Sequence, residues 1–539
     1  MILTGNKNDV AKSDRRARQA LAAFVLVEAT ALPVLVALGR SVWFTADEWD
    51  FVAHRTAWNL DDLFRPHNEH WSTLPILVYR LLWWLFGLRT HLPHLIIALV
   101  LHLTVAALLR AVMRQAAVGP WLATIAASAF VWFGAGYFNA EFAFQMAWCA
   151  ALAFGLGYLL LVLHDGPFDR RDVIGLLLGL ASLMCAGPGV ATTIVVVLAV
   201  FLRRGYRLAL LHAAPLGASF LIWWAAIGRG NYSRHASLVD AARFMGRNLW
   251  ATFRSLGSVP GAGAALVILL GTGLALQWTG RRRATEAGSQ SASQSRSWAG
   301  PVAMLVGAPL FLFITGIGRG APSGPFGQAS NVSRYLHVAG ALVLPALALA
   351  ADTVVKRWRS LAPAVAATLA IGIPGNIGAF VDGTHGLVEQ TRGERSFILS
   401  AARNPVAPRL PRTMSPYFAS ADLTMGWLLD SVRSGRVPPT RPLTPDELAT
   451  QTLSLALRPP RAPLESCRRL ENRRVFALRK GQSLRVASGR VDMIYLAPGG
   501  ARSLPARLPS ATMTALVGPL RLQLVPRPPG AAFAFILCG

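Results

Sequence analysis

Charged residues are scarce in this sequence, and acidic residues are the scarcer of the two signs. Asp, Glu, Lys and Arg make up 15% of the 539 residues, whereas a typical soluble domain carries about 25%. This shortage, together with a hydrophobic content of 53%, excludes an ordinary soluble globular protein. Long apolar runs recur between residues 21 and 380. We therefore expect most of the chain to be a bundle of membrane helices.

Signatures of several other protein classes are also missing. There is no internal repeat, and the first apolar run, Leu21 to Leu38, is too long for a signal peptide and lacks a small-residue cleavage site. The net charge of +27 comes largely from arginine clusters between apolar runs. No basic stripe is interleaved with aromatic residues, so we expect no nucleic-acid partner. Such clusters instead set membrane topology and contact membrane lipids.

Hydropathy and charge predict an all-α polytopic membrane protein with about eleven spans between residues 21 and 380. The basic residues 1–20 place the N-terminus in the cytoplasm by the positive-inside rule. An outer loop then covers residues 43–91. Its apolar run 74–88 is short for a span of about 20 residues, so we interpret it as a helix lying in the outer membrane interface.

One predicted outer loop, residues 229–258, breaks the charge rule because it is rich in arginine. Two interpretations remain open. The arginines contact anionic lipid head groups, or they bind a phosphate-bearing substrate, since the guanidinium fork matches phosphate oxygens. The loop contains Arg229, Arg234, Arg243, Arg247 and Arg254.

Residues 381–539 differ in character from the rest of the chain. Prolines multiply, no further span follows, and alternating segments separated by Gly and Pro indicate short strands. We predict a Pro-rich linker and a small β-rich domain on the extracytoplasmic side. Cys467 and Cys538 bracket the strands, and in an oxidising compartment we expect them to form a disulfide. The other two cysteines, Cys149 and Cys185, lie in apolar spans and are expected to be inert.

The polar stretch 47–72 stands out in a half of the chain that is otherwise poor in acids. A carboxylate just beyond the outer end of a membrane helix is partly desolvated, which raises its pKa toward that of a useful base. We predict Asp47 and Glu48 as catalytic residues; the alternative is an interface anchor or a helix cap. On a continuing helix, Asp50 and His54 would share a face with Asp47 and contact substrate. The acids of the stretch are Asp47, Glu48, Asp50, Asp61, Asp62 and Glu69.

The segment His67-Asn68-Glu69-His70 follows Pro66 in the same stretch. Its HxxH spacing suits two metal ligands, with Glu69 or an aspartate as a third. It equally suits hydrogen bonds to a sugar or phosphate, or a structural loop network. We favour substrate contact for His67, Asn68, Glu69 and His70, and we assign no metal ligand, although a divalent metal stays possible.

Two further outer loops carry candidate binding residues. Glu141 follows the third predicted span, where the alternative is an ordinary polar span end. The Gly/Ser-rich segment 318–337 contains Arg319, Arg334 and Tyr335. Gly-rich backbone approaches phosphate closely and arginine neutralises it, so we predict phosphate binding rather than a flexible loop with interface anchors.

Glu28, His102 and His212 lie inside predicted spans, where ionisable residues are functional candidates by default. Three scattered residues with no visible chain of partners do not make a proton relay. We therefore expect packed, neutral or paired side chains.

The order of these features along the chain resembles that of the GT-C superfamily of membrane glycosyltransferases. This superfamily includes protein O-mannosyltransferases and the lipid A aminoarabinose transferase. The resembling features are a basic cytoplasmic N-terminus, one span, an outer loop opening with the acidic pair Asp47-Glu48, and the run LPILVYRLLWWLFGL after PHNEHWS. A span ending in LLRAVMRQ follows. The sequence departs from the family where a KPP-type run is replaced by PHNEHWSTLP.

The resemblance implies transfer of a sugar from a polyprenyl-phosphate donor to a glycan, lipid or protein acceptor on the outer face of a bacterial plasma membrane. It implies that Asp47 is the general base and that Arg and His residues stabilise the departing lipid phosphate. Two other functions remain open. A flippase or transporter of lipid-linked sugars would need Glu28, His102 and His212 to line one path, and a polysaccharide polymerase or ligase would use similar chemistry.

Overall fold

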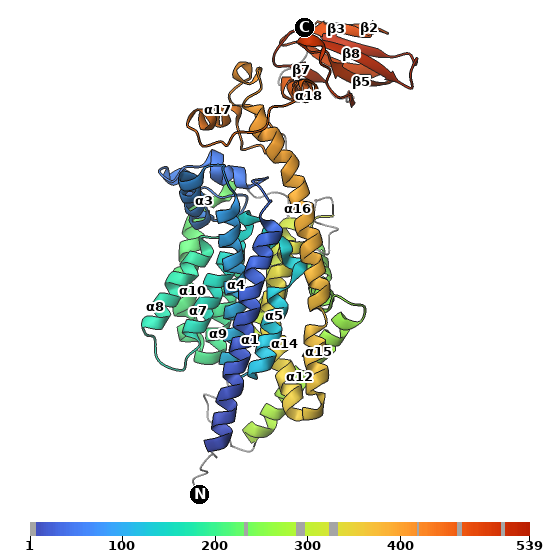
Figure 1. Cartoon of the computed structure of the whole chain (residues 1–539). Coiled ribbons are helices and arrows are strands. Elements are labelled where there is room, and N and C mark those ends of the chain that lie inside the picture. Colours follow the sequence, from blue (N-terminus) through green and yellow to red (C-terminus); the bar gives the residue numbers. More distant parts are fainter. Residues whose placement is uncertain are drawn as a thin grey trace. The chain divides into compact units, whose positions relative to one another are not determined.

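The computed structural model describes residues 7–230, 236–286, 297–322, 332–417, 420–460, 466–507 and 512–539. The described chain is mostly helical, with a small region of β-sheet near the C-terminus (Figure 1). It divides into two compact units. The helical unit comprises Met1–Val42, Arg55–Leu82 and His91–Val388, and the C-terminal unit comprises Trp43–His54, Trp83–Thr90 and Glu389–Gly539.

The helical unit is built from helices of very different lengths (Figure 1). The first part of the chain forms α1 (Lys7–Gly39), α2 (Leu60–Phe64), α4 (Leu92–Gln115), α5 (Pro120–Val131), α6 (Tyr137–Glu141), α7 (Met146–Val162), α8 (Arg170–Leu183) and α9 (Pro188–Arg204). The second part forms α10 (Tyr206–Ala226), α11 (Leu238–Gly257), α12 (Ala262–Glu286), α13 (Ala299–Arg319), α14 (Ser333–Arg357) and α15 (Ala362–Ala370). Helices α3 (Thr73–Phe86) and α16 (Ile373–Ala401) each contribute residues to both units.

Local signals explain where several of these helices begin. Asp169 and Asp172 form a capping box at the start of α8. The Asp169 side chain accepts a backbone N–H from the first turn of the helix, and the Asp172 side chain accepts the backbone N–H of Asp169. Pro188 opens α9, a position where its missing N–H costs nothing. Gly205, with φ of +89°, separates α9 from α10, since a residue with a side chain adopts that conformation only under strain.

Eight helices of the described chain are long and apolar enough to cross a membrane. A ninth span results if α5 is joined to the segment Gly134–Glu141, to which it is bent by 43°. These helices make the protein a candidate multi-pass membrane protein. Helices α8 and α9, with 14 and 17 residues, fall below the length of a full span. The predicted count of about eleven is therefore not confirmed.

Helix α14 lies at the centre of the helical unit and is the most buried of the span-length helices. It packs against α4, α5, α11, α12 and α13. Small residues on its surface let these neighbours approach closely. At Gly273 of α12, for example, an added Cβ would lie 2.4 Å from the carbonyl oxygen of Ala350. The packing at this site thus excludes any larger residue in place of Gly273.

The arginine-rich segment 229–258 was expected to be a loop, but most of it is the 20-residue helix α11. Its buried residues recur at helical spacing and face α13 and α14. The arginines of α11, of which Arg243 and Arg254 are exposed, lower its mean hydropathy and conceal this pattern from a hydropathy search. Arg234 lies outside the described residues.

The C-terminal unit contains the predicted small β-rich region. Helices α17 (Met425–Arg433) and α18 (Pro445–Ala456) precede it. The strands are β1 (Leu457–Arg458), β2 (Cys467–Glu471), β3 (Val475–Leu478), β4 (Ser483–Ser488), β5 (Arg490–Tyr495), β6 (Ala506–Arg507), β7 (Met513–Ala515), β8 (Leu520–Arg527) and β9 (Ala534–Cys538). They form a five-stranded sheet in the order β1-β7-β4-β9-β2 and a four-stranded sheet in the order β3-β8-β5-β6, and all pairs are antiparallel.

The two sheets share one hydrophobic core. Buried and exposed residues alternate along β8, as expected for a strand with one face against a core. Phe476 of one sheet stacks on Phe535 of the other, with ring centroids 4.9 Å apart. Cys467 and Cys538, the two cysteines for which the sequence predicts a disulfide, are opposite each other on β2 and β9 and are disulfide-bonded.

Candidate functional site

The acidic pair that follows α1 belongs to the C-terminal unit, and its two members differ in role. The carboxylate of Glu48 is buried and accepts a hydrogen bond from the backbone N–H of Thr45 at 3.0 Å. The N–H of Asp50 donates to the carbonyl of Asp47 at 3.2 Å, which closes the turn. The side chain of Asp47 is partly exposed. The capping alternative therefore has direct support for Glu48, and Asp47 is the more accessible carboxylate.

Asp50 and His54 come next, at the two ends of a short π-helix, Asp50–His54. Their Oδ1 and Nδ1 atoms lie 3.2 Å apart. The same His54 nitrogen lies 3.3 Å from Oδ1 of Asp422, which precedes α17 in the same unit. The structure thus brings the two predicted residues together and adds Asp422, which sequence reasoning missed.

In the helical unit, residues His67–His70 form a tight turn. The N–H of each terminal histidine donates to the carbonyl of the other, at 3.0 and 2.9 Å. Asn68 has a φ of +52°, a conformation that asparagine tolerates better than most residues, and it is exposed. Neither His67 nor His70 belongs to a three-residue group of possible metal ligands in the described part of the chain. The geometry therefore shows a tight turn that presents side chains.

Arg55 stabilises this turn, a role that the sequence alone did not indicate. Its buried guanidinium donates to the carbonyls of Asp62 at 3.1 Å and of Pro66 at 3.0 Å. Immediately after the turn, Trp71 stacks on Trp223 of α10 with ring centroids 5.2 Å apart. The His67–His70 turn is thus fixed at both of its ends.

Glu69 joins this turn to the end of α13 through a two-oxygen ion pair. Nη2 of Arg319 lies 2.6 and 2.7 Å from the two carboxylate oxygens. Arg319 is the last residue of α13 and opens the Gly/Ser-rich segment in which phosphate binding is predicted. Two segments selected separately from the sequence are therefore in contact; residues 323–331, in the middle of the second segment, lie outside the described residues.

Trp148 of α7 connects the same turn to the start of α14. Its ring packs edge-on against His70, with centroids 6.0 Å apart, and contacts Tyr335 at the same separation. The guanidinium carbon of Arg334 lies 5.2 Å from the Tyr335 ring centroid, a cation–π arrangement. We refer to His67, Glu69, His70, Arg319, Arg334, Tyr335 and Trp148 as the cationic cluster.

The charges of the cationic cluster follow from its burial and its two arginines. Burial lowers the pKa of His70 to about 4, with Glu69 opposing this effect and His67, Arg319 and Arg334 adding to it. Burial by itself raises the pKa of Glu69, but His70 and the hydrogen bonds and charge of Arg319 outweigh it and lower the pKa. At neutral pH, two guanidinium groups therefore face one carboxylate and a neutral His70, which leaves a net positive charge suited to an anion.

Glu141 is not part of this cluster. Its carboxylate is fully buried at the end of α6 and has no hydrogen-bond partner among the residues that the structure describes. It lies against Gly39 at the end of α1, where an added Cβ would come within 2.0 Å of Oε2. Among the described residues, no hydrogen bond joins Glu141 to the other predicted site residues, and its substrate-binding role stays a prediction.

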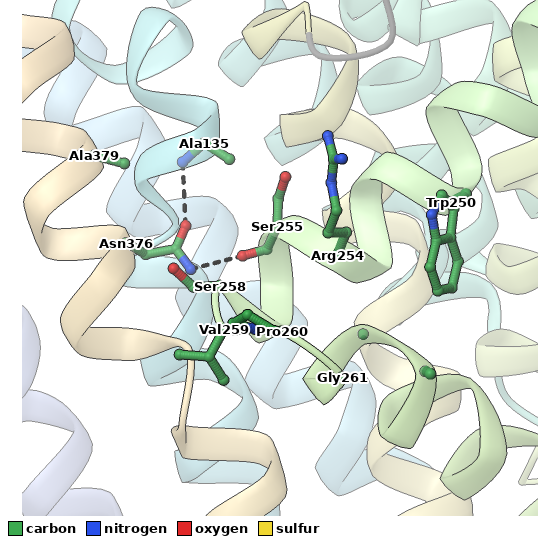
Figure 2. A pocket seen from close by; sticks show the side chains of 12 residues that line it. Ala135, Trp250, Arg254, Ser255, Ser258, Val259, Pro260, Gly261, Asn376 and Ala379 are labelled. Carbon is green, nitrogen blue, oxygen red and sulfur yellow. Dashed lines mark hydrogen bonds between the residues drawn. The ribbon is translucent and has the colours of Figure 1, made fainter.

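A pocket of about 580 Å³ lies between the end of α11, the start of α12 and α16 (Figure 2). Its walls are mostly apolar, and Arg254, Ser255 and Ser258 are among the polar residues that line it. Asn376 closes one side by accepting a hydrogen bond from the N–H of Ala135 at 3.2 Å and donating to the carbonyl of Ser255 at 2.8 Å. The pocket therefore combines apolar surface with an arginine from the arginine-rich segment.

The ionisable residues within the spans form separate networks. His212 contacts Asp172 at 3.0 Å and the Tyr158 hydroxyl at 2.8 Å, and His102 contacts His337 at 3.0 Å. In the described chain, no hydrogen bond or ion pair links Glu28, His102 and His212 to one another. His102 and His212 are therefore paired and packed, and the arrangement gives no support to a shared transport path.

A scan against protein-family models finds no match to this sequence, and searches of curated proteins and of solved structures find none either.

Proposed function

We propose that the protein is a GT-C-like integral membrane glycosyltransferase that transfers a sugar from a polyprenyl-phosphate donor to a glycan, lipid or protein acceptor. In this proposal it has about eleven spans in a bacterial plasma membrane, with the N-terminus in the cytoplasm and the β-rich region outside. Asp47 takes the proton of the acceptor hydroxyl. The acceptor oxygen then attacks the anomeric carbon, and the bond from that carbon to the phosphate oxygen breaks with inversion of configuration.

The observation that carries this proposal is the contact between the His67–His70 turn and the end of α13. The sequence predicts substrate contact for the first segment and phosphate binding for the second, and the Glu69–Arg319 ion pair joins them. In the proposed reaction the departing phosphate gains negative charge, and Arg319, Arg334 and neutral His70 provide donors for it. Because Glu69 neutralises one arginine, a substrate phosphate completes the charge balance of the cluster.

The pocket beside Arg254 supports the lipid part of the proposal. Apolar walls that include an arginine fit a hydrophobic tail that carries a phosphate. The pocket lies near the end of α11, whereas Phe244, nearer the start of the same helix, contacts Tyr335 of the cationic cluster. Ten residues of helix from Phe244 to Arg254 correspond to about 15 Å. The two places are therefore distinct, and their contributions can be measured separately.

The experiment uses purified full-length protein in liposomes with host membranes as the source of acceptor. Polyprenyl-phosphate sugars with a radiolabelled sugar are supplied, and transfer of label and release of polyprenyl phosphate are measured. Arg334→Ala is expected to lower kcat by about 10- to 1000-fold, as expected for lost stabilisation of developing charge. Arg254→Ala is expected to raise KM for the donor with a smaller effect on kcat.

Arg171→Ala is the matched control, because Arg171 is an exposed arginine that pairs with Asp169 at the start of α8. It should leave both constants unchanged. The proposal fails if the wild-type protein releases no polyprenyl phosphate from any of the donors, or if Arg334→Ala turns over the donor as fast as Arg171→Ala.

A further inference from the structure

Asp50, His54 and Asp422 form a group of three possible metal ligands inside the C-terminal unit. One ligand atom from each lies within 4.8 Å of the others. Asp50 is buried, whereas the side chains of His54 and Asp422 are 49% and 38% exposed, so the group opens toward solvent on one side. This group is separate from the cationic cluster and uses none of its residues.

The positions of the two carboxylates favour a cation over a plain hydrogen bond. Both aspartates approach the same histidine nitrogen, Nδ1, at 3.2 and 3.3 Å. A single N–H points well at one acceptor only, and charge-assisted hydrogen bonds are shorter, at about 2.7–2.9 Å. Around a cation with ligands at about 2.1 Å, neighbouring ligand atoms lie about 3.0 to 3.4 Å apart for octahedral and tetrahedral geometry. The two separations between His54 Nδ1 and the aspartate oxygens fall within that range.

The backbone supplies a second reason for this arrangement. Residues Asp50–His54 form a π-helix, whose wider turn aligns the first and fifth side chains differently from an α-helix. Asp422 comes from the turn just before Thr424, which caps α17. Ligands from two separate parts of the chain thus converge on one point, as in a built site rather than a local ion pair.

The other three-residue group of possible ligands in the described chain has a different character. Asp172 in the group His164, Asp169 and Asp172 is already paired with Arg204 and His212. The arginine charge there replaces the charge that a metal would supply.

We propose that Asp50, His54 and Asp422 bind a divalent transition-metal cation such as Zn²⁺ or Mn²⁺. Two carboxylate oxygens and one imidazole nitrogen are a common donor set for these ions, and three protein ligands leave positions open for water or a substrate oxygen. The cation would tie the segment after α1 to the C-terminal part of the same unit, so binding is expected to stabilise the folded protein. The proposal does not depend on glycosyl transfer.

The test uses full-length protein purified in detergent through a tag without histidine and stripped of metal with EDTA. Co²⁺ absorption spectra and calorimetric titrations with ZnCl₂ and MnCl₂ measure binding. Wild type is expected to bind one ion that His54→Ala and Asp422→Asn bind at least about tenfold more weakly. His164→Ala, in the group paired with Arg204, is the matched control and should bind like wild type.

Melting temperatures with and without Zn²⁺ separate a metal site from an ion pair. A metal site predicts that Zn²⁺ raises the melting temperature of wild type and of His164→Ala, but not that of Asp422→Asn. An ion pair predicts that Asp422→Asn lowers the melting temperature equally in EDTA and in Zn²⁺. The proposal is overturned by this second pattern of melting temperatures. It is also overturned if all variants bind the metal equally, or if wild type binds none at millimolar metal.

Discussion

Glu69 and Arg319 form an ion pair in which one guanidinium nitrogen lies 2.6 and 2.7 Å from the two carboxylate oxygens. The residues are 250 positions apart in the chain, and both side chains are less than a third exposed. The pair fixes the His67–His70 turn against the end of α13.

A double-mutant cycle of Glu69→Gln and Arg319→Ala is expected to give a coupling energy of about 1–3 kcal/mol, as for charged hydrogen bonds shielded from water. Reversible SDS-induced unfolding measures it. The exposed pair Asp169 and Arg171 is the matched control and should couple much more weakly. Equal coupling in the two pairs would show that the Glu69–Arg319 contact is only a surface ion pair.

The low pKa of His70 predicts a loss of stability in mild acid. Burial lowers this pKa to about 4 in the folded protein, from an ordinary value of 6.5. Between these values the unfolded chain binds more protons than the folded protein, so stability falls as the pH is lowered from about 6.5 to 4.5. The loss is on the order of 2 kcal/mol. Melting temperatures measured across this range should fall less for His70→Gln than for wild type, and parallel curves would contradict the assignment.

Gly134 is predicted to tolerate no larger residue. An added Cβ would lie 1.8 Å from the carbonyl oxygen of Asn376 and 2.6 Å from the backbone nitrogen of Phe380, so α16 would have to move. Gly134→Ala should therefore lower the melting temperature strongly. Gly246→Ala, inside α11 with nothing within 4 Å of the added Cβ, is the control and should stabilise by about 0.5–1 kcal/mol. If the two substitutions changed the melting temperature equally, Gly134 would not be closely packed against α16.

The disulfide between Cys467 and Cys538 is predicted to stabilise the two small sheets. It closes a long loop within the C-terminal unit, and removing such a bond typically costs about 2–4 kcal/mol. Cys467→Ser with Cys538→Ser, or reduction of wild type, should make the sheet region more sensitive to protease. Cys149→Ser and Cys185→Ser, at buried free cysteines, should not produce this sensitivity. Equal protease resistance with and without the bond would contradict the prediction.

The sequence predicts a mostly helical apolar region and C-terminal strands, because both follow from local periodicity, but its count of about eleven spans is not confirmed. It misses α11, since the exposed Arg243 and Arg254 conceal an amphipathic pattern. It also cannot reach Asp422 or Trp148, because their roles arise from contacts with His54 and His70 far away in the chain. Glu48 shows a different limit, since an acidic residue that caps a turn and one that acts as a base look alike in sequence.

The most direct measurement of the central proposal is the transfer of radiolabelled sugar from a polyprenyl-phosphate donor by wild type and by Asp47→Asn. The substitution removes the proposed base and keeps the size of the side chain, so kcat should fall by about 100- to 10,000-fold while the melting temperature stays near that of wild type. Glu48→Gln, at the buried carboxylate that caps the turn, should mainly lower the melting temperature. If Asp47→Asn transfers sugar at the wild-type rate, Asp47 is not the base and the proposed mechanism is wrong.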